Sequence, residues 1–240
     1  MLLRAALLVA GLATVSLGTV APALAQNTGK PGDFDYLTLA LTWSPTFCAD
    51  KRNAKERQCS RQRRPYAFVL HGLWPQYEKG WPQFCRTRDK PWVSRKVIDT
   101  MLDIMPSRKL VIHQYRKHGV CSGLSAPKFF RLSRLLFEKV KIPRKFTNLS
   151  RGLNIATRDV EAAFLRANPK LQPEMISVQC GRGRRLREVR ICFNKKGRFR
   201  ACSINESQRR LCRSRDIYLP PVREGRPDRA QLTGSRVTPG

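Results

Sequence analysis

Large apolar and smaller side chains alternate near the start of the chain and predict a strand over residues 36–43. This segment reads YLTLALTW, and Pro45 ends the pattern. A period of two is typical of a strand with one buried face. Residues 66–70 form a second apolar run that leads directly to His71 and Gly72, so we expect a buried strand that ends at this histidine. Loops at the ends of strands commonly build functional sites.

The middle of the chain has the helical period, with apolar residues three and four positions apart. Ser94 is a candidate N-cap for the first such segment, Pro106 ends it, and Pro127 stands in the first turn of a later one. We expect four helices, over residues 94–105, about 109–118 and 125–140 and, with Thr157 as a candidate cap, from 157 onward.

Beyond Pro173 the spacing of apolar residues changes from the helical period to one typical of strands. Three segments are typical of short strands between basic or glycine-rich turns: ISVQC (176–180), LREVRICF (186–193) and FRACS (199–203). After Pro221 the chain is rich in Arg, Pro, Gly and Ser and has few apolar residues. We therefore expect a basic, disordered tail over residues 221–240.

The first 25 residues are typical of an export signal. Arg4 precedes an apolar stretch that is short for a membrane span, and the small residues Ala23 and Ala25 frame a cleavage site. We expect residues 1–25 to be removed, a flexible N-terminus over 26–33 and one domain over 34–220. The mature chain would be periplasmic or extracellular, without stable membrane insertion.

Eight cysteines follow the signal, an even number in a chain predicted to be exported. This favours four disulfides over metal ligation, and no Cys-x-x-Cys pair indicates zinc. Spacing leaves the connectivity open, although the nearness of Cys48 to Cys59 and the run of four from Cys180 on favour local pairs. The eight are Cys48, Cys59, Cys85, Cys121, Cys180, Cys192, Cys202 and Cys212.

The charge is strongly unbalanced, with 47 Lys and Arg against 17 Asp and Glu and a net charge of +30. Self-repulsion of this size destabilises a folded chain, which favours a polyanionic partner: RNA, DNA or an anionic surface. A general solubility feature is the alternative. We interpret the basic runs at 61–64 and 182–185 as contacts to phosphates without sequence specificity.

Three histidines occur, and they lie in two short segments. His71 opens HGLWPQ, while HQYRKHGVC begins at His113 and contains His118. On a helix, Gln114 lies four residues before His118. Lys117 lies four residues after His113, so two adjoining rows present four polar side chains to one region. This concentration indicates a functional site.

A zinc site is the alternative that any histidine cluster raises. His113 and His118 are five residues apart and fall on different faces of a helix, whereas a zincin site needs a spacing of four with a glutamate between. Neither segment contains an acidic residue, and Arg116 and Lys117 would repel a dication. We therefore predict no metal ion and no other cofactor.

Two imidazoles beside a lysine suit the cleavage of RNA. Histidine titrates near neutral pH, so one ring can accept the proton of the 2′-hydroxyl while the other protonates the leaving 5′-oxygen. A lysine can stabilise the added negative charge on the pentacoordinate phosphorus. Because RNA supplies its own nucleophile, DNA should not be cleaved.

The two histidine segments closely resemble the active-site segments of the ribonuclease T2 family. The run YLTLALTWSPTFC before them and LREVRICF with its flanking cysteines after them support the resemblance, which spans residues 34–218. It implies an α+β fold in which helices flank an antiparallel sheet. It also implies a metal-independent endoribonuclease that cleaves single-stranded RNA, with low sequence specificity, to 2′,3′-cyclic phosphates and then 3′-phosphates.

The resemblance also implies a role for each polar residue. His71 would be the general acid and His118 the general base of the first step, with the roles exchanged in the second. His113 would help to hold the phosphate, and Lys117 would stabilise the transition state. The implied disulfides are Cys85–Cys121, Cys180–Cys212 and Cys192–Cys202, with Cys48–Cys59 left as the fourth pair.

Two residues depart from the family pattern. Gln114 stands where the family usually has glutamate, and loss of that charge should lower the pKa of the nearby imidazoles. Gln76 stands where fungal members have an acidic residue that helps to choose the base, so the base preference is open. Trp74 is either a stacking surface for a base or a core tryptophan.

Two other classes of protein fit parts of this pattern. One is a cationic RNA- or membrane-binding protein in which catalysis is dispensable. The other is an inactive RNA-binding relative, which the presence of both acid–base histidines and Lys117 disfavours. We predict the enzyme, acting on RNA as a monomer.

Overall fold

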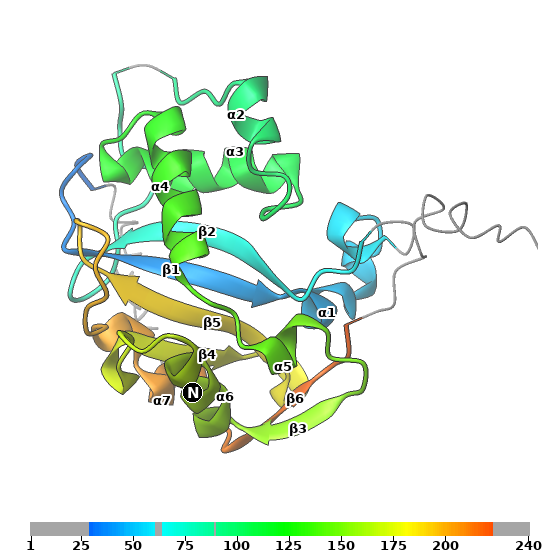
Figure 1. Cartoon of the computed structure of the whole chain (residues 1–240). Coiled ribbons are helices and arrows are strands. Elements are labelled where there is room, and N and C mark those ends of the chain that lie inside the picture. Colours follow the sequence, from blue (N-terminus) through cyan, green and yellow to red (C-terminus); the bar gives the residue numbers. More distant parts are fainter. Residues whose placement is uncertain (1–28, 61–63, 89, 223–240) are drawn as a thin grey trace, which may run out of the picture.

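Four antiparallel strands form the central sheet, in the order β2-β1-β5-β4. The computed structural model of the chain describes residues 29–60, 64–88 and 90–222, so the predicted export signal and residues 223–240 of the predicted tail lie outside the described residues. The strands are β1 (Tyr36–Trp43), β2 (Phe68–Gln76), β4 (Ile176–Cys180) and β5 (Leu186–Phe193). The sheet and its helices (Figure 1) confirm the predicted α+β class.

Helices pack beside both edges of the sheet. Three of them, α2, α3 and α4, gather on the β2 side, while α6 and α7 lie beside β4 (Figure 1). The helices are α1 (Ser44–Cys48), α2 (Arg95–Asp99), α3 (Arg108–Lys117), α4 (Ala126–Lys139), α5 (Arg144–Thr147), α6 (Thr157–Ala167) and α7 (Gln208–Leu211). Short 3-10 turns lie at Lys51–Asn53, Arg57–Cys59, Gly119–Ser122, Pro173–Met175, Arg182–Arg184 and Ile204–Glu206. A separate pair joins β3 (Leu153–Ala156) to β6 (Asp216–Leu219).

One face of the central sheet carries the main core. Leu39 and Leu41 of β1 are fully buried opposite Leu73 and Leu70 of β2, and Phe129 of α4 belongs to the same apolar cluster. Side chains alternate between the two faces of a strand, so the neighbours of these leucines point away from this core.

The other face of the sheet carries polar side chains. Glu188 of β5 pairs with Thr42 of β1, and Arg190 pairs with Ala40, which sets both charged residues on this second face. The polar face, rather than the leucine face, therefore positions the candidate site.

His71 lies on a β-bulge inside β2. Leu41 pairs with Leu70, and Ala40, the residue before Leu41, pairs with Gly72. His71 is therefore an extra residue without a partner in β1. The prediction of a strand over residues 66–70 that ends at His71 is wrong, because β2 begins at Phe68 and continues to Gln76. A bulge interrupts the pairing, bends the strand and re-aims a side chain, and bulges are common beside active sites.

Two predicted helices agree closely with the structure and two differ from it. α3 and α4 lie within one residue of their predicted bounds. α2 has the predicted cap, since the Ser94 hydroxyl accepts from the Val97 amide, but it ends at Asp99 instead of residue 105. Thr157 does not cap α6: it is the first helical residue, and its hydroxyl donates to the carbonyls of Ser214 and Arg215.

The strands predicted after residue 173 are correct in two cases of three. β4 and β5 have the predicted bounds. The FRACS segment forms only a single bridge, between Phe199 and Phe193, because the chain turns away at the disulfide of Cys202. β3 and β6, which are only four residues long, were not predicted.

Four disulfides hold the described chain together. Their pairs are Cys48–Cys59, Cys85–Cys121, Cys180–Cys212 and Cys192–Cys202, the same pairs that the family resemblance implies. Cys85–Cys121 connects the loop after β2 to the 3-10 turn after α3, which ties together the two histidine segments. In the part of the chain that the structure describes, no helix is both long and apolar enough to cross a bilayer.

Candidate active site

One cavity collects every polar or aromatic residue that the sequence predicts to take part in the chemistry. Its volume is about 290 Å³. The predicted residues that line it are His71, Trp74, Gln76, His113, Gln114, Lys117 and His118. Six further residues, none of them predicted from the sequence, complete the lining: Trp81, Arg187, Glu188, Arg190, Asn205 and Glu206.

The two histidine segments meet through a direct hydrogen bond. Trp74 Nε1 donates to Gln114 Oε1 over 2.7 Å, and both side chains are buried. Gly72 makes this approach possible: a Cβ atom on Gly72 would lie 2.1 Å from Gln114 Oε1, well inside contact distance. A glycine is therefore required at position 72 because another side chain occupies its space, and β2 packs closely against α3.

The end of α3 is fixed from the loop after β2. Phe84, with a φ of 49°, has the left-handed conformation that is uncommon outside glycine. Its amide donates to the Lys117 carbonyl over 2.8 Å, and its ring lies 6.0 Å from Lys117 Nζ. The neighbouring Cys85–Cys121 disulfide holds the same corner. These contacts place the ammonium group of Lys117 at the cavity.

His118 lies in an enclosed and electropositive environment. It is the C-cap residue of α3 and is 7% exposed. Burial, reinforced by the charges of Lys117, His71 and His113, lowers the pKa of His118 to about 3. Its Nδ1 is buried without a hydrogen-bond partner among the described residues. The ring is therefore neutral at pH 5 to 7 and can accept a proton.

His71 has a carboxylate partner. Its Nδ1 lies 2.7 Å from Oε1 of Glu188, a residue only 2% exposed. Oε2 of Glu188 accepts from Arg190 Nε and Nη2 at 3.1 and 3.0 Å. Burial raises the pKa of Glu188, but the hydrogen bond and charge of His71, with the charges of Arg190 and Arg187, hold that pKa at about 2. The carboxylate is therefore ionised.

His113 lines the small cavity together with the two other histidines. Partial burial lowers its pKa, and the charges of Lys117 and His71 lower it further. His113 also lines a larger neighbouring cavity of about 840 Å³, which shares His71, Arg187 and Glu188 with the smaller one. Two imidazoles, one guanidinium group and one carboxylate thus line both cavities.

Basic residues continue along the larger cavity. Arg182 and Arg185, from the predicted phosphate-contact run at 182–185, both line it, as does Lys109. Residues 61–63 of the other basic run lie outside the described residues. Arg64 lies at no described cavity and donates to the Asp103 carbonyl instead.

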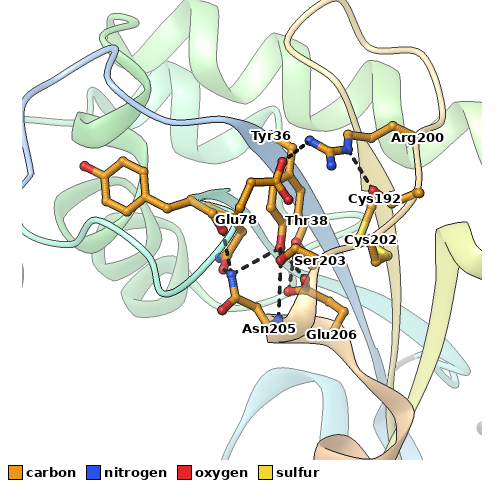
Figure 2. Close-up of a disulfide and its surroundings, with 12 residues drawn as sticks. Tyr36, Thr38, Glu78, Cys192, Arg200, Cys202, Ser203, Asn205 and Glu206 are labelled. Atoms are coloured by element: carbon orange, nitrogen blue, oxygen red, sulfur yellow. Dashed lines mark hydrogen bonds and ion pairs between the residues drawn. A yellow bond between two sulfur atoms is a disulfide. The ribbon is translucent and has the colours of Figure 1, made fainter.

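A buried hydrogen-bond network forms the wall of the small cavity beside Gln76. Asn205 Nδ2 donates to Gln76 Oε1 at 3.3 Å and to the Tyr77 and Gly80 carbonyls at 2.8 and 2.9 Å. Figure 2 shows Asn205 and Glu206 beside Tyr36, just after the Cys192–Cys202 disulfide. This segment therefore fixes the position of the Gln76 side chain.

The carboxyl of Glu206 differs from that of Glu188 although both are buried at the cavity. Burial raises the pKa of Glu206, opposed by hydrogen bonds from the Tyr36 and Thr38 hydroxyls. Its direct partners are neutral hydroxyls, whereas Glu188 contacts an imidazole and a guanidinium group. Glu188, and not Glu206, therefore contacts a histidine of the site.

Two tryptophans have different exposures at the cavity. Trp74 is 8% exposed and packs against the rings of His71 and His118, with the Arg190 guanidinium 4.9 Å from its centroid. These contacts fit the packed tryptophan, one of the two alternatives that the sequence leaves open. Trp81 is 44% exposed, so its ring is accessible at the edge of the cavity.

A signal for Glu188 was present in the sequence. It is the only acidic residue between positions 175 and 205 and stands between Arg187 and Arg190 in an otherwise apolar strand. A buried carboxylate in such a strand needs a partner. Asn205 and Glu206 carry no comparable local signal, since a disulfide brings their segment to the site. Among the described residues, no group of three His, Cys, Asp or Glu side chains is placed to hold a metal ion.

Comparisons with known proteins place this site in a family. The model of the ribonuclease T2 family matches residues 34–202. A ribonuclease of Aeromonas hydrophila is 37% identical over 216 residues, which cover 82% of this chain and 91% of that protein. Ribonuclease I of Escherichia coli (strain K12) is 28% identical over 212 residues, covering 71% and 79%. The solved structure of the RNase-related protein from Calystegia sepium has the same fold, with a TM-score of 0.59 and 21% identity over 82% of this chain and 100% of that one. The chain belongs to the ribonuclease T2 family and is an RNA endoribonuclease.

Proposed function

We propose that the protein cleaves single-stranded RNA without a metal ion, with His71 and His118 as its acid–base pair. One observation carries the proposal: two imidazoles line a single cavity, one paired with an ionised carboxylate and the other buried among positive charges. Environments that differ in this way separate a proton donor from a proton acceptor.

In the first step His118 acts as the base. Its neutral ring takes the proton of the 2′-hydroxyl, the 2′-oxygen bonds to phosphorus, and the bond from phosphorus to the 5′-oxygen breaks. His71, in its imidazolium form, delivers a proton to that leaving oxygen. The products are a 2′,3′-cyclic phosphate and a 5′-hydroxyl end.

In the second step the two histidines exchange roles. His71, now neutral, takes a proton from water, whose oxygen bonds to phosphorus. The bond from phosphorus to the 2′-oxygen breaks, and His118 returns its proton to that oxygen to leave a 3′-phosphate. Lys117 stabilises the charge of both phosphorane transition states, and His113 helps to hold the phosphate.

The substrate lies across the two cavities. The smaller one holds a base beside Trp81 and Gln76, and the larger one receives the neighbouring nucleotide and its phosphates along Arg182 and Arg185. The structure of RNase NT in complex with 5′-AMP and that of an RNase MC1 mutant in complex with 5′-UMP, both similar in fold to this chain, support a nucleotide site. Contacts to phosphates dominate, so sequence specificity is low.

The enzyme acts outside the cytoplasm as a monomer. The predicted signal over residues 1–25 and the four disulfides both fit an oxidising compartment, periplasmic or extracellular. We place the domain at residues 34–220, with a short N-terminal segment before it and a basic tail after it.

Digestion of a short RNA and its all-2′-deoxy counterpart in excess EDTA tests the proposal. Wild type should cleave only the RNA, and mass spectrometry should detect 2′,3′-cyclic phosphate ends first and 3′-phosphate ends later. His118→Ala should lose about 10²- to 10⁴-fold in rate, the usual loss for a missing acid or base. Cleavage of the deoxy strand, or a requirement for added metal, would contradict the mechanism.

The same experiment separates the cationic binding protein from the enzyme. A wild-type chain that binds RNA but leaves it intact would favour the binding protein. Retention of full activity in His118→Ala would remove His118 from the chemistry. Either outcome would overturn the proposal.

A further inference from the structure

Glu188 is a buried charge in the middle of a β-strand, which is an unusual position for a carboxylate. Only 2% of it is exposed, and it faces the cavity from β5 opposite Thr42 of β1. An unpaired charge in such a place is strongly destabilising. Two partners engage it, one on each oxygen: His71 at Oε1 and Arg190 at Oε2.

Arg190 is itself held in place on three sides. It donates from Nε and Nη2 to Glu188, and Nη2 also donates to Gln179 Oε1 at 2.9 Å. Its guanidinium group lies over the Trp74 ring, 4.9 Å from the centroid. Glu188 therefore cannot rotate away from His71 without breaking several contacts, so its Oε1 atom is held toward His71.

We propose that Glu188 is a positioning residue, which keeps the proton of His71 on Nδ1 and stabilises the imidazolium so that Nε2 presents the proton for the leaving 5′-oxygen. This inference rests on the proposed acid role of His71. The hydrogen bond from Nδ1–H to the carboxylate selects the tautomer, as a buried carboxylate does for histidine in other catalytic arrangements. In the second step, the same contact makes neutral His71 a stronger proton acceptor at Nε2.

Asp50 and Glu56 line the larger cavity with His71, but Asp50 pairs with Arg52. The cationic groups that line the small cavity oppose the imidazolium form of His71. Arg187 and Arg190 of β5 and Lys117 of α3 are cationic, and His113 and His118 can become so. The other acid of the cavity, Glu206, accepts hydrogen bonds from the hydroxyls of Tyr36 and Thr38 instead. Among the described residues that line the small cavity, Glu188 is thus the carboxylate able to hold the positive charge of His71.

Glu188→Gln tests the proposal with almost no change of volume. The variant should show about a 10- to 100-fold lower kcat on a dinucleotide, with KM within about twofold. The loss should fall on kcat, because Glu188 hydrogen-bonds to His71 and contacts no substrate atom in the proposed mechanism. Glu188→Asp, which keeps the charge, should recover part of the lost kcat.

A substrate with an aryl leaving group makes the test specific. Uridine 3′-(4-nitrophenyl phosphate) releases a phenolate that needs no proton, so Glu188→Gln should cleave it within about threefold of the wild-type rate. Equal losses on both substrates would show a general disturbance of the site and overturn the proposal. Glu161→Gln is the matched control: it removes a half-buried carboxyl group of α6 that lines neither cavity, and it should leave the rates on both substrates unchanged.

Nitrogen-15 NMR of labelled histidine gives a readout that does not depend on activity. In wild type the His71 signals should show a proton on Nδ1 across the titration, and in Glu188→Gln the form with a proton on Nε2 should appear as the ring becomes neutral. An unchanged tautomer would overturn the inference. Because this measurement needs no substrate, it separates failure of the inference from failure of the proposed RNA cleavage.

Discussion

His71 and His118 line the same small cavity, yet their surroundings differ in almost every respect. His71 projects from a bulge of β2, has a side chain that is 29% exposed and hydrogen-bonds to the ionised Glu188. His118 ends α3, is 7% exposed and has cationic neighbours. The opposite functions that we propose for these two identical side chains in proton transfer follow from the groups packed around them.

The two histidines also differ in the cavities that they line. His71 lines both the small and the large cavity, whereas His118 lines only the small one of these two. In the proposed mechanism the leaving oxygen continues into the rest of the RNA chain, while the attacking hydroxyl belongs to the nucleotide that we place in the small cavity. An acid at the open side and a base at the enclosed side therefore fit the direction in which the substrate must run.

The largest expected effects come from removing each histidine and measuring the rate on substrates with different leaving groups. On RNA, His71→Ala and His118→Ala should each lose about 10²- to 10⁴-fold. On uridine 3′-(4-nitrophenyl phosphate), His71→Ala should recover to within about tenfold of wild type, since no acid is needed, while His118→Ala should not. Recovery of His118→Ala instead would reverse the assigned roles.

The burial of His118 should also be visible in protein stability. Its pKa is about 3 in the folded chain against an ordinary value of 6.5, so the unfolded chain binds more protons between those pH values. Stability must then fall as the pH falls through this window, by roughly 1 kcal/mol per pH unit from this residue. His118→Gln should lose less free energy of unfolding than wild type between pH 6.5 and 4.5. Urea denaturation measures the difference, in which carboxylates common to both proteins cancel; equal losses would mean that His118 is not buried as described.

An acidic residue at position 114 should make the surroundings of His118 more like those of His71. Gln114→Glu keeps an acceptor for Trp74 Nε1, now 2.7 Å away, and adds a negative charge one helical turn before His118. The pKa of His118 should rise, which moves the acid limb of the pH–rate profile up by about one unit. Gln172→Glu, at an exposed position outside both cavities, adds the same charge as a control. An acid limb that stays in place would contradict the electrostatic account.

The smallest expected effect concerns the arginines of the larger cavity, which His71 also lines. Replacing Arg182 and Arg185 by alanine should lower kcat/KM a few-fold at low salt and reduce the slope of log kcat/KM against log salt by about one for each phosphate that is no longer bound. Arg131→Ala, on the exposed face of α4, should leave the slope unchanged. A wild-type rate that does not respond to salt would exclude a binding path along these arginines.

Seven of the residues that line the small cavity could be predicted because their signals are local. The histidine segments are contiguous in sequence, and helical spacing alone brings Gln114, Lys117 and His118 near one another. Glu188, which hydrogen-bonds to His71, is different, because pairing between strands that are distant in the sequence brings it to the site. Glu188 reaches His71 across β1, a separation of 117 residues, which no local pattern encodes.

The errors in the predicted elements have the same origin. β2 appeared to end at His71 because a bulge shifts the apolar positions from a spacing of two to three, as between Leu70 and Leu73. α2 was predicted too long because Met101 and Met105 are buried in turns, where they keep a helical spacing without a helix. Burial fixes which side chains must be apolar, but several backbone conformations can bury the same residues.

The bulge at His71 has a practical consequence for recognising or redesigning such nucleases. The five letters HGLWP acquire their geometry only beside a strand that pairs past the extra residue, as β1 does between Ala40 and Leu41. Grafted onto a regularly paired strand, the same letters would aim either the imidazole or the leucine to the wrong side, since each added residue reverses the direction of those that follow. The transferable unit is therefore a pair of strands in a fixed register, and a search for the motif alone will accept chains that cannot assemble the site.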